Sequence, residues 1–263
     1  MRPHYAAGAL LLSAVLTRPP AAARVQPPAV GPDTVTLSPG DATLRLRRVR
    51  LATDTIVVLV TPRDSGEHLA AMLIRRIERV TVGSADVFRE TQRYTMPDGS
   101  WEVDTLDVSA ETLALQRIVE ASAHATNDLR VDGTRIVGTV TTDSGPRAAD
   151  TPLVPLFHDM MTEAFVGAYP LDSGTTVIVP EFRPPSLAVR PAPMTVIGSA
   201  VVRTIGGPVD CLVIQGPRTA TRWIARADGR LVRLRWTLPN GTTVWKLPQH
   251  DVVLPRPASV ARI

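Results

Sequence analysis

The chain has 263 residues, of which 44% are hydrophobic and 21% charged, and its formal net charge is +4. This balance excludes a nucleic-acid-binding protein, which would concentrate far more excess positive charge. Cys211 is the only cysteine, so the chain cannot form an internal disulfide. The sequence around Cys211 contains no partner residues for a metal site or for a thiol nucleophile.

The N-terminal stretch has the layout of a secretory signal peptide. Arg2 precedes an apolar run of 11 residues, 6–16, which is too short to span about 30 Å of hydrocarbon, and Ala21-x-Ala23 supplies small residues for cleavage. Residues 1–23 are therefore predicted to be a signal peptide, and the mature protein to be soluble and exported, either periplasmic or extracellular. No later stretch is long and apolar enough to span a membrane, and Cys211 lies too far from the cleavage site to anchor a lipoprotein.

Residues 24–42 and 251–263 are rich in proline and lack periodicity, so they are predicted to be a flexible leader and a flexible tail. The region between them, 43–250, is predicted to be a single all-β domain. Short runs of Val, Ile, Thr and Leu alternate there with turn signals, at the regular spacing of an antiparallel meander. The exception is "FHDMMTEAFVGAY", 157–169, which is predicted to be a short helix that acts as a lid or strut across a curved sheet.

The C-terminal hairpins allow a prediction of strand register. If Asp228-Gly229 and Asn240-Gly241 are two-residue type I′ loops, Trp236 lies opposite Trp245 and side chains alternate between two faces. One face then gathers the candidate residues for an apolar ligand, which are Trp223, Val232, Leu234, Trp236, Trp245 and Leu247. The other face gathers the candidates for contacts with anionic groups, which are Arg222, Arg233 and Arg235, together with Lys246.

Each of these faces has two interpretations. The apolar face is either the packed core of the domain or the lining of a cavity, because a curved sheet that does not close fully can leave space for a hydrophobic ligand. The arginine face is either a solvated surface or a contact for anionic head groups or an acidic partner. The hairpin pattern is compatible with both alternatives for each face.

Four stretches together resemble a family of exported bacterial β-rich proteins that is classed as a domain of unknown function. They are "GTRIVGTV" (133–140), "PLDSG" (170–174), "VIGSAVVRTIGGPVDCLVI" (196–214) and "TRWIARADGRLVRLRW" (221–236), and the match spans roughly residues 86–247. That family is similar in architecture to the half-barrel of the lipoprotein carriers LolA and LolB. The resemblance implies an open antiparallel barrel with a helical lid and an apolar concave side. Unlike LolB, this chain has no lipid-anchor cysteine, so lipoprotein trafficking is not implied.

Asp172-Ser173-Gly174-Thr175 matches the signature that aspartic peptidases carry around each catalytic aspartate. Such an enzyme needs two carboxylates that share one proton. The chain has two further Asp-Ser-Gly triplets, at Asp64 and Asp143, but neither follows an apolar strand. Asp, Ser and Gly are also the residues that tight turns favour, so the motif predicts a corner between the helix and the next strands. A peptidase remains the remote alternative, and it would require two copies of Asp172 to meet across a dimer axis.

No other catalytic or metal-binding motif stands out. His158-Asp159 beside Glu163 is interpreted as a capping pair rather than a metal site, and Glu102, Asp104 and Asp107 lie in what looks like an exposed strand or turn. We therefore expect a protein without cofactor or metal that binds rather than transforms. The leading hypothesis is a carrier or binding module for a hydrophobic or lipid-like molecule in the cell envelope. The alternative is a structural or interaction protein of the envelope whose barrel is filled by its own side chains and which contacts a protein partner.

Overall fold

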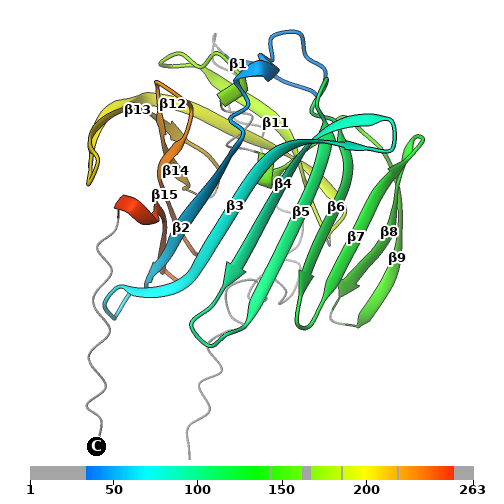
Figure 1. Ribbon diagram of the computed structural model, residues 1–263, viewed down its shortest axis with the longest axis horizontal. Coiled ribbons are helices and arrows are strands. Elements are labelled where there is room, and N and C mark those ends of the chain that lie inside the picture. The colour runs from blue at the N-terminus through cyan, green and yellow to red at the C-terminus, as the bar shows by residue number, and fades with distance from the viewer. Residues whose placement is uncertain (1–33, 143, 162–166, 185, 218, 252–263) are drawn as a thin grey trace, which may run out of the picture.

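Nearly all regular structure in the computed structural model is β, which confirms the predicted fold class (Figure 1). The structure describes residues 34–142, 144–161, 167–184, 186–217 and 219–251. The strands are β1 (Thr34–Thr36), β2 (Ala52–Thr61), β3 (His68–Val82), β4 (Ala85–Thr95), β5 (Trp101–Ser109), β6 (Leu115–Ser122), β7 (Thr126–Asp132), β8 (Arg135–Thr142), β9 (Gly145–Pro152), β10 (Phe157–His158), β11 (Thr176–Arg183), β12 (Ala188–Thr204), β13 (Gly207–Gln215), β14 (Thr221–Ala225), β15 (Leu231–Thr237) and β16 (Thr243–Pro248). Three 3-10 turns accompany them, which are η2 (Leu46–Arg48), η3 (Asp159–Met161) and η4 (Gln249–Asp251). No helix in the described part of the chain has the length and apolar character needed to cross a membrane.

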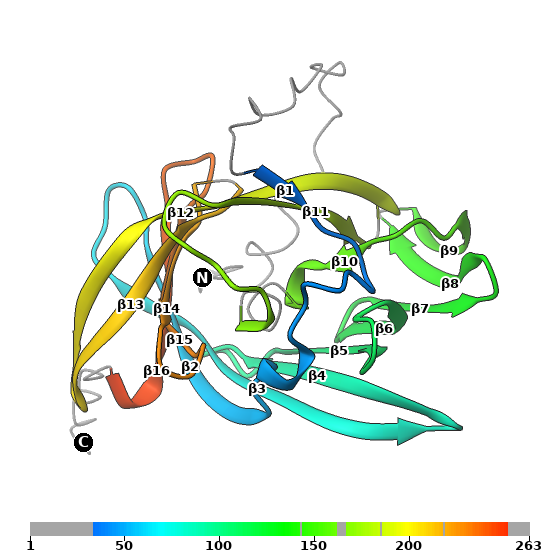
Figure 2. The same cartoon turned by 90° about the horizontal axis from the view of Figure 1, so that it is seen from above.

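The strands form one continuous sheet that curls round on itself without closing. Its order is β1-β11-β12-β13-β14-β15-β16-β2-β3-β4-β5-β6-β7-β8-β9, and β10 pairs with β11 off this path. Two meanders, β2 to β9 and β11 to β16, are joined by antiparallel pairing of β16 with β2. The sheet therefore has β9 at one edge and β11, with β1 and β10, at the other, which gives the open barrel that Figure 2 shows from above.

Gly138 on β8 lets this strand approach its neighbour β7 closely. It has φ +147°, and a Cβ atom built on it would lie 2.0 Å from the backbone oxygen of Asp128 on the neighbouring strand β7. Since no L side chain fits this space, the pairing of β7 with β8 depends on glycine at this position.

The concave face of the sheet is the main core. On β5, for example, Leu106 and Val108 belong to the main cluster of buried side chains, whereas Thr105 and Asp107 line a hollow on the opposite, outer face. The segment after β9 packs into the same cluster through Leu156 and Met161, and Figure 2 shows β10 inside the ring of strands. This segment therefore fills the interior and does not cover it as the predicted lid would.

Two predictions about local structure need correction. Residues 157–158 are not helical, because Phe157 pairs in parallel with Glu181 on the free edge of β11; η3 follows, and residues 162–166 lie outside the described residues. Residues 34–42 do not belong to a flexible leader, because β1 pairs with β11 and Leu37 is fully buried. In both places a sheet edge supplies hydrogen bonds that local sequence does not reveal.

The predicted register of the C-terminal hairpins is wrong by one residue. The chain reverses through the three residues 239–241, where the N–H of Leu238 donates to the oxygen of Thr242 at 2.8 Å and Gly241 has φ +83°. As a result, Trp236 faces Val244 and not Trp245. The Asp228-Gly229 loop is also longer than two residues, because the N–H of Ala225 donates to the oxygen of Arg230 at 2.9 Å. A shift of one residue moves a strand's side chains to the opposite face, so the predicted faces are not those of the folded chain.

Candidate functional site

The nine candidate residues from the sequence divide between the two faces of the sheet. Leu234 and Trp236 point inward and pack against the main core, and Arg222 lies opposite Leu234 on the same face. The residues on the outer face are Trp223, Val232, Arg233, Arg235, Trp245 and Leu247. The predicted single apolar face therefore does not exist, and neither does the predicted single arginine face, because Arg222 lies opposite Leu234 whereas Arg235 lies opposite Thr221.

The outer-face tryptophans and arginines form a packed cluster of their own. Trp223 and Trp245 stack with ring centroids 6.4 Å apart and an interplanar angle of 24°. The guanidinium groups of Arg233 and Arg235 lie 6.0 and 5.7 Å from the centroid of the Trp245 ring. Such cation–π contacts contribute about 0.5–1 kcal/mol each at exposed sites, so this arrangement explains how two arginines tolerate each other on one strand.

The inner wall carries a set of acidic residues, two of which, Glu102 and Asp104, were predicted to lie in an exposed strand or turn. Glu102 and Asp104 alternate with Leu106 on β5, so all three face the core. Asp104 lies directly opposite Glu120 on β6 and opposite Gln92 on β4. Together with one residue of η3 they form what we call the inner acid cluster, which consists of Glu102, Asp104, Glu120 and Asp159.

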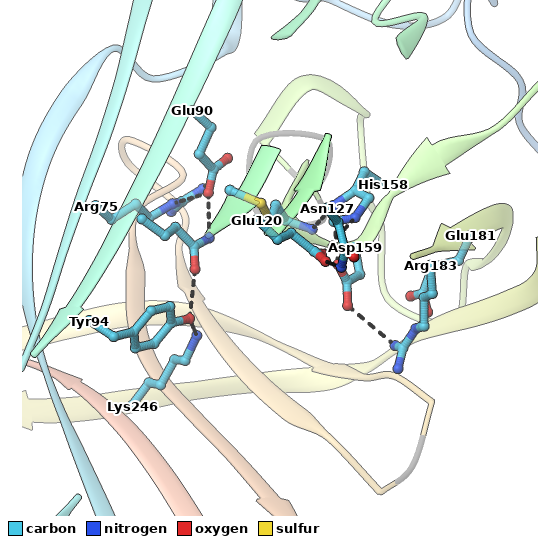
Figure 3. A network of polar contacts seen from close by, with 12 residues as sticks. Arg75, Glu90, Tyr94, Glu120, Asn127, His158, Asp159, Glu181, Arg183 and Lys246 are labelled. Atoms are coloured by element: carbon cyan, nitrogen blue, oxygen red, sulfur yellow. Dashed lines mark hydrogen bonds and ion pairs between the residues drawn. The ribbon is translucent and has the colours of Figure 1, made fainter. Parts of the chain in front are cut away.

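His158 meets this cluster from the opposite side. Its side chain is only 2% exposed, and its Nε2 lies 3.8 Å from Glu120 Oε1 (Figure 3). Its Nδ1 lies 3.3 Å from the backbone nitrogen of Met160, which donates to it, and 3.2 Å from Asp159 Oδ1. The other carboxylate oxygen of Glu120, Oε2, accepts a hydrogen bond from Asn127 Nδ2 at 2.8 Å. The short strand β10 therefore brings an imidazole onto the acidic wall.

Burial sets the protonation of these groups. It raises the pKa of Asp104 to about 8, with further contributions from Glu102, Glu120 and Asp159. It raises the pKa of Glu120 to about 7, against the hydrogen bond from Asn127, and it also raises the pKa of Glu102. Burial lowers the pKa of His158, so its ring is neutral. At neutral pH the site therefore holds protons on groups that are ionised in water.

A chain of hydrogen bonds crosses the wall beside the cluster. Buried Arg75 donates to Glu90 at 2.8 Å, and Glu90 accepts from Gln92 at 2.7 Å. Tyr94 donates its hydroxyl hydrogen to Gln92 at 2.7 Å, and Lys246, the only lysine of the chain, donates to the Tyr94 oxygen at 2.9 Å (Figure 3). Each of these side chains has a hydrogen-bond partner, so the hydrogen bonds stabilise the wall and hold Lys246 near the acids.

The sequence contained a signal for this site, namely polar residues at every second position. Glu90, Gln92 and Tyr94 alternate along β4, and Glu102 and Asp104 along β5. In a half-exposed strand, such polar residues are expected to face water. The opposite orientation follows from which side of the sheet the rest of the chain covers, and a single strand does not encode that.

The inner wall also has an apolar part at one end of the barrel. Four inward side chains there are only partly buried, which are Tyr94, Met96, Trp236 and Leu238. They pack on a second cluster of buried apolar residues, which are Ile56, Val58, Val60, Ala70, Ala71, Leu73 and Val244. We call these four side chains the apolar rim, because they come from the ends of β4 and β15 and the turns that follow.

A hollow of about 240 Å³ lies on the outer face, between β4, β5 and β6. Its lining includes Arg89 and Arg117, but both arginines are already ion-paired. Arg89 binds Asp107 through two contacts of 2.7 Å, and Arg117 binds Asp128 at 2.8 Å. The hollow is therefore a polar groove with satisfied charges, and it does not match the apolar cavity that a lipid-like ligand requires.

The peptidase and metal alternatives find no support in the described residues. Asp172 is exposed in a turn, where the N–H of Thr175 donates to its backbone oxygen at 3.1 Å and Gly174 has φ +88°. Among the residues that the structure describes, no three His, Cys, Asp or Glu are placed to hold a metal ion. Residue 143 and Glu163, which belonged to these alternatives, lie outside that part of the chain.

Neither a protein-family model nor a curated protein matches this sequence. Among solved structures, the chain is similar to a beta-barrel-like protein of domain of unknown function DUF1849 from Brucella abortus. The TM-score is 0.46 at 12% sequence identity, and the match covers 76% of this chain and 96% of that chain. At this degree of similarity no ligand or activity is transferred from that protein.

Proposed function

We propose that this protein is a non-enzymatic binding module or carrier for a hydrophobic or lipid-like molecule in the cell envelope. In this proposal the signal peptide predicted at residues 1–23 directs export, and the chain shares the open-barrel architecture of the carriers LolA and LolB that its motifs resemble. The observation that carries the proposal is the apolar rim, where large apolar side chains face the inside of a curved sheet and remain partly exposed.

The geometry of the rim suits an acyl chain or a similar group. The turns after β2, β4 and β15 lie at one end of the barrel, since β2, β3, β4, β15 and β16 are consecutive antiparallel neighbours. An apolar ligand that enters at this end contacts Trp236 and Met96 over a floor of buried aliphatic residues. Each 100 Å² of apolar surface removed from water contributes roughly 2.5 kcal/mol, so modest coverage of the rim gives measurable affinity.

One observation favours the second candidate, a structural or interaction protein. Much of the interior is filled by the chain itself, because the segment with β10 and η3 packs into the main core through Leu156, Phe157 and Met161. In that case the partly exposed rim would be a boundary of the core, and the outer cluster of Trp223, Trp245 and the two arginines would be the surface for a protein partner. The two candidates differ in whether the purified protein carries a small molecule.

Native mass spectrometry of the exported protein tests the proposal, with Trp236→Ala and Trp223→Ala as a matched pair. Trp236 belongs to the rim, whereas Trp223 lies on the outer face. We expect the wild type and Trp223→Ala to carry a lipid-like adduct and Trp236→Ala to lose it, with Leu238→Ser as a milder rim variant in case Trp236→Ala does not fold. Wild-type protein without adduct and without affinity for fatty-acid probes would overturn the proposal.

A further inference from the structure

We propose that a hollow at the opposite end of the barrel from the apolar rim binds a phosphate group, either free or as the head group of a phosphomonoester. Its lining includes four arginines from separate parts of the chain, which are Arg48, Arg50, Arg75 and Arg230, together with the carboxylate of Asp54. This inference goes beyond the proposed function and does not depend on it. Three features carry it, namely the position of the hollow, the balance of its charges and the hydrogen-bond donors that its arginines leave unused.

The hollow lies on the inner face of the sheet, at the end where β2 and β15 begin. Arg75 on β3 lies directly opposite Asp54 near the start of β2, and Leu231, the first residue of β15, also lines the hollow. The apolar rim lies at the other ends of these strands. Val60, in the floor of the rim, is six residues, or about 20 Å, from Asp54 along β2, and buried Ile56 lies between them. The hollow is therefore a separate site from the rim.

Backbone contacts bring two of the arginines to the hollow. A Cβ atom built on Gly167 would lie 3.5 Å from the backbone oxygen of Arg48, and one built on Gly229 would lie 3.4 Å from Gly167 Cα. Because these glycines have no side chains, the segment with Arg48 and the loop before β15 both pack directly on residue 167. The N–H of Ala225 donates to the oxygen of Arg230 at 2.9 Å, which fixes the end of that loop. The positions of Arg48 and Arg230 are thus set by the backbone.

The other two arginines are ion-paired, but Arg50 keeps unused donors. Buried Arg75 donates to Glu90 at 2.8 Å (Figure 3). Arg50 reaches both carboxylate oxygens of Asp54 through a single nitrogen, Nη1, at 3.0 and 2.7 Å. Its Nε and Nη2 make no hydrogen bond with the described residues, and the side chain is 33% exposed. Arg50 can therefore donate to a further acceptor in the hollow.

The positive charge of the hollow exceeds the negative charge around it. Arg230 Nε comes only within 3.5 Å of Asp228 Oδ2, and its Nη1 is buried without a hydrogen-bond partner among the described residues. Arg48 is exposed and forms no ion pair within the described part of the chain. Even when Asp228 is counted with Asp54 and Glu90, four arginines face three carboxylates. An anion in the hollow would balance this excess.

A phosphate group fits these donors better than a carboxylate. The planar fork of one arginine matches one carboxylate, whereas the oxygens of a phosphate group can accept from several guanidinium groups at once. The hollow has a volume of about 20 Å³, which is room for little more than one water-sized group. One phosphate oxygen therefore enters it, and the others remain at its mouth beside the exposed Arg48. An ester group on one of these outer oxygens would point to solvent, so a phosphomonoester fits as well as free phosphate.

Titration calorimetry on the full exported chain tests the inference, in phosphate-free buffer at low ionic strength, with inorganic phosphate, glycerophosphate and glycerol as probes. We expect both phosphates to bind with a Kd of about 1 mM or below, and glycerol not to bind. Arg48→Gln and Arg230→Gln should each weaken phosphate binding at least about tenfold, because each removes a charged hydrogen-bond donor. Arg47→Gln is the matched control, since Arg47 is exposed on the same turn η2 but is not in the lining of the hollow. It should change the affinity less than about twofold.

The relative affinity of the two phosphates identifies the source of the group. Tighter binding of inorganic phosphate indicates a free anion, tighter binding of glycerophosphate indicates a head group, and equal binding indicates a site that accepts both. The inference is overturned if neither phosphate binds, if Arg48→Gln and Arg230→Gln bind as tightly as the wild type, or if Arg47→Gln weakens binding as much as they do. If Arg230→Gln does not fold, the surface variant Arg48→Gln decides. Trp236→Ala should bind phosphate as the wild type does, so failure here leaves the function proposed for the rim unaffected.

Discussion

Replacing Asp104 with asparagine removes a carboxyl group whose ionisation the folded protein opposes. Burial, together with Glu102, Glu120 and Asp159, raises the pKa of Asp104 from 3.8 to about 8. Between these two values the unfolded chain has lost the proton while the folded chain keeps it. The folded state is therefore destabilised progressively as pH rises through this window, and little affected below it. Asparagine has nearly the same shape and does not ionise, so the variant should escape this loss.

The magnitude follows from the difference between the two pKa values. A difference of one pKa unit is worth about 1.4 kcal/mol, so a carboxyl group that titrates at 3.8 when unfolded and at about 8 when folded weakens folding by about 6 kcal/mol above both values. Part of this cost is shared with Glu102 and Glu120, which remain in the variant. We therefore expect Asp104→Asn to raise the free energy of unfolding by about 2–3 kcal/mol near pH 9, and by less than about 1 kcal/mol near pH 5.

Urea unfolding followed by tryptophan fluorescence at three pH values, near 5, 7 and 9, measures this difference. The control is Asp107→Asn on the same strand, because Asp107 points outward and binds Arg89 through two contacts of 2.7 Å. That variant should lose about 1–3 kcal/mol at every pH in this range. If Asp104→Asn is less stable than the wild type near pH 9, or if its advantage does not grow from pH 5 to pH 9, the assignment of Asp104 to a buried acidic wall is incorrect.

Two further predictions test the strand arrangement. Gly138→Ala places a methyl group 2.0 Å from a backbone oxygen of β7, so it should lower the free energy of unfolding by more than about 2 kcal/mol. The control is Gly133→Ala, in a turn with open space and φ +57°, which should lower the free energy of unfolding by only about 1 kcal/mol. Thermal unfolding measures both. The stacked pair of Trp223 and Trp245, with centroids 6.4 Å apart, should give an exciton couplet in the far-ultraviolet circular dichroism spectrum that either single Trp→Phe variant abolishes. A couplet that disappears only in Trp236→Phe would restore the register with Trp236 opposite Trp245.

The fold class could be predicted from the sequence, because it depends on local features. Turn residues such as Asp132-Gly133 and Asn240-Gly241 do separate strands, and the runs between them do form an antiparallel meander. Glycine, aspartate and asparagine at these positions favour turns whatever the rest of the chain does. The exposed turn at Asp172 was recognisable for the same reason.

The candidate site could not be predicted from the sequence, because it depends on which face each strand turns inward. The loop after Leu238 has three residues rather than two, and this single residue places Trp236 inside and Trp245 outside. The acidic wall could not be predicted for the same reason, since Glu102 and Asp104 alternate with apolar residues just as the polar residues of an exposed strand would. His158 lies 38 residues after Glu120 in the sequence, and only the parallel pairing of β10 with β11 brings the two side chains together.

By itself, the sequence determined a chain of short strands with turns at defined positions, because propensity and turn chemistry act over a few neighbouring residues. The tertiary structure decided the register, the inward face and the interior segment. These depend on pairings between distant strands, such as Thr61 with Thr243 and Phe157 with Glu181, that close the sheet round its core. Because side chains alternate along a strand, its pairing register determines which side chains face the core along its whole length.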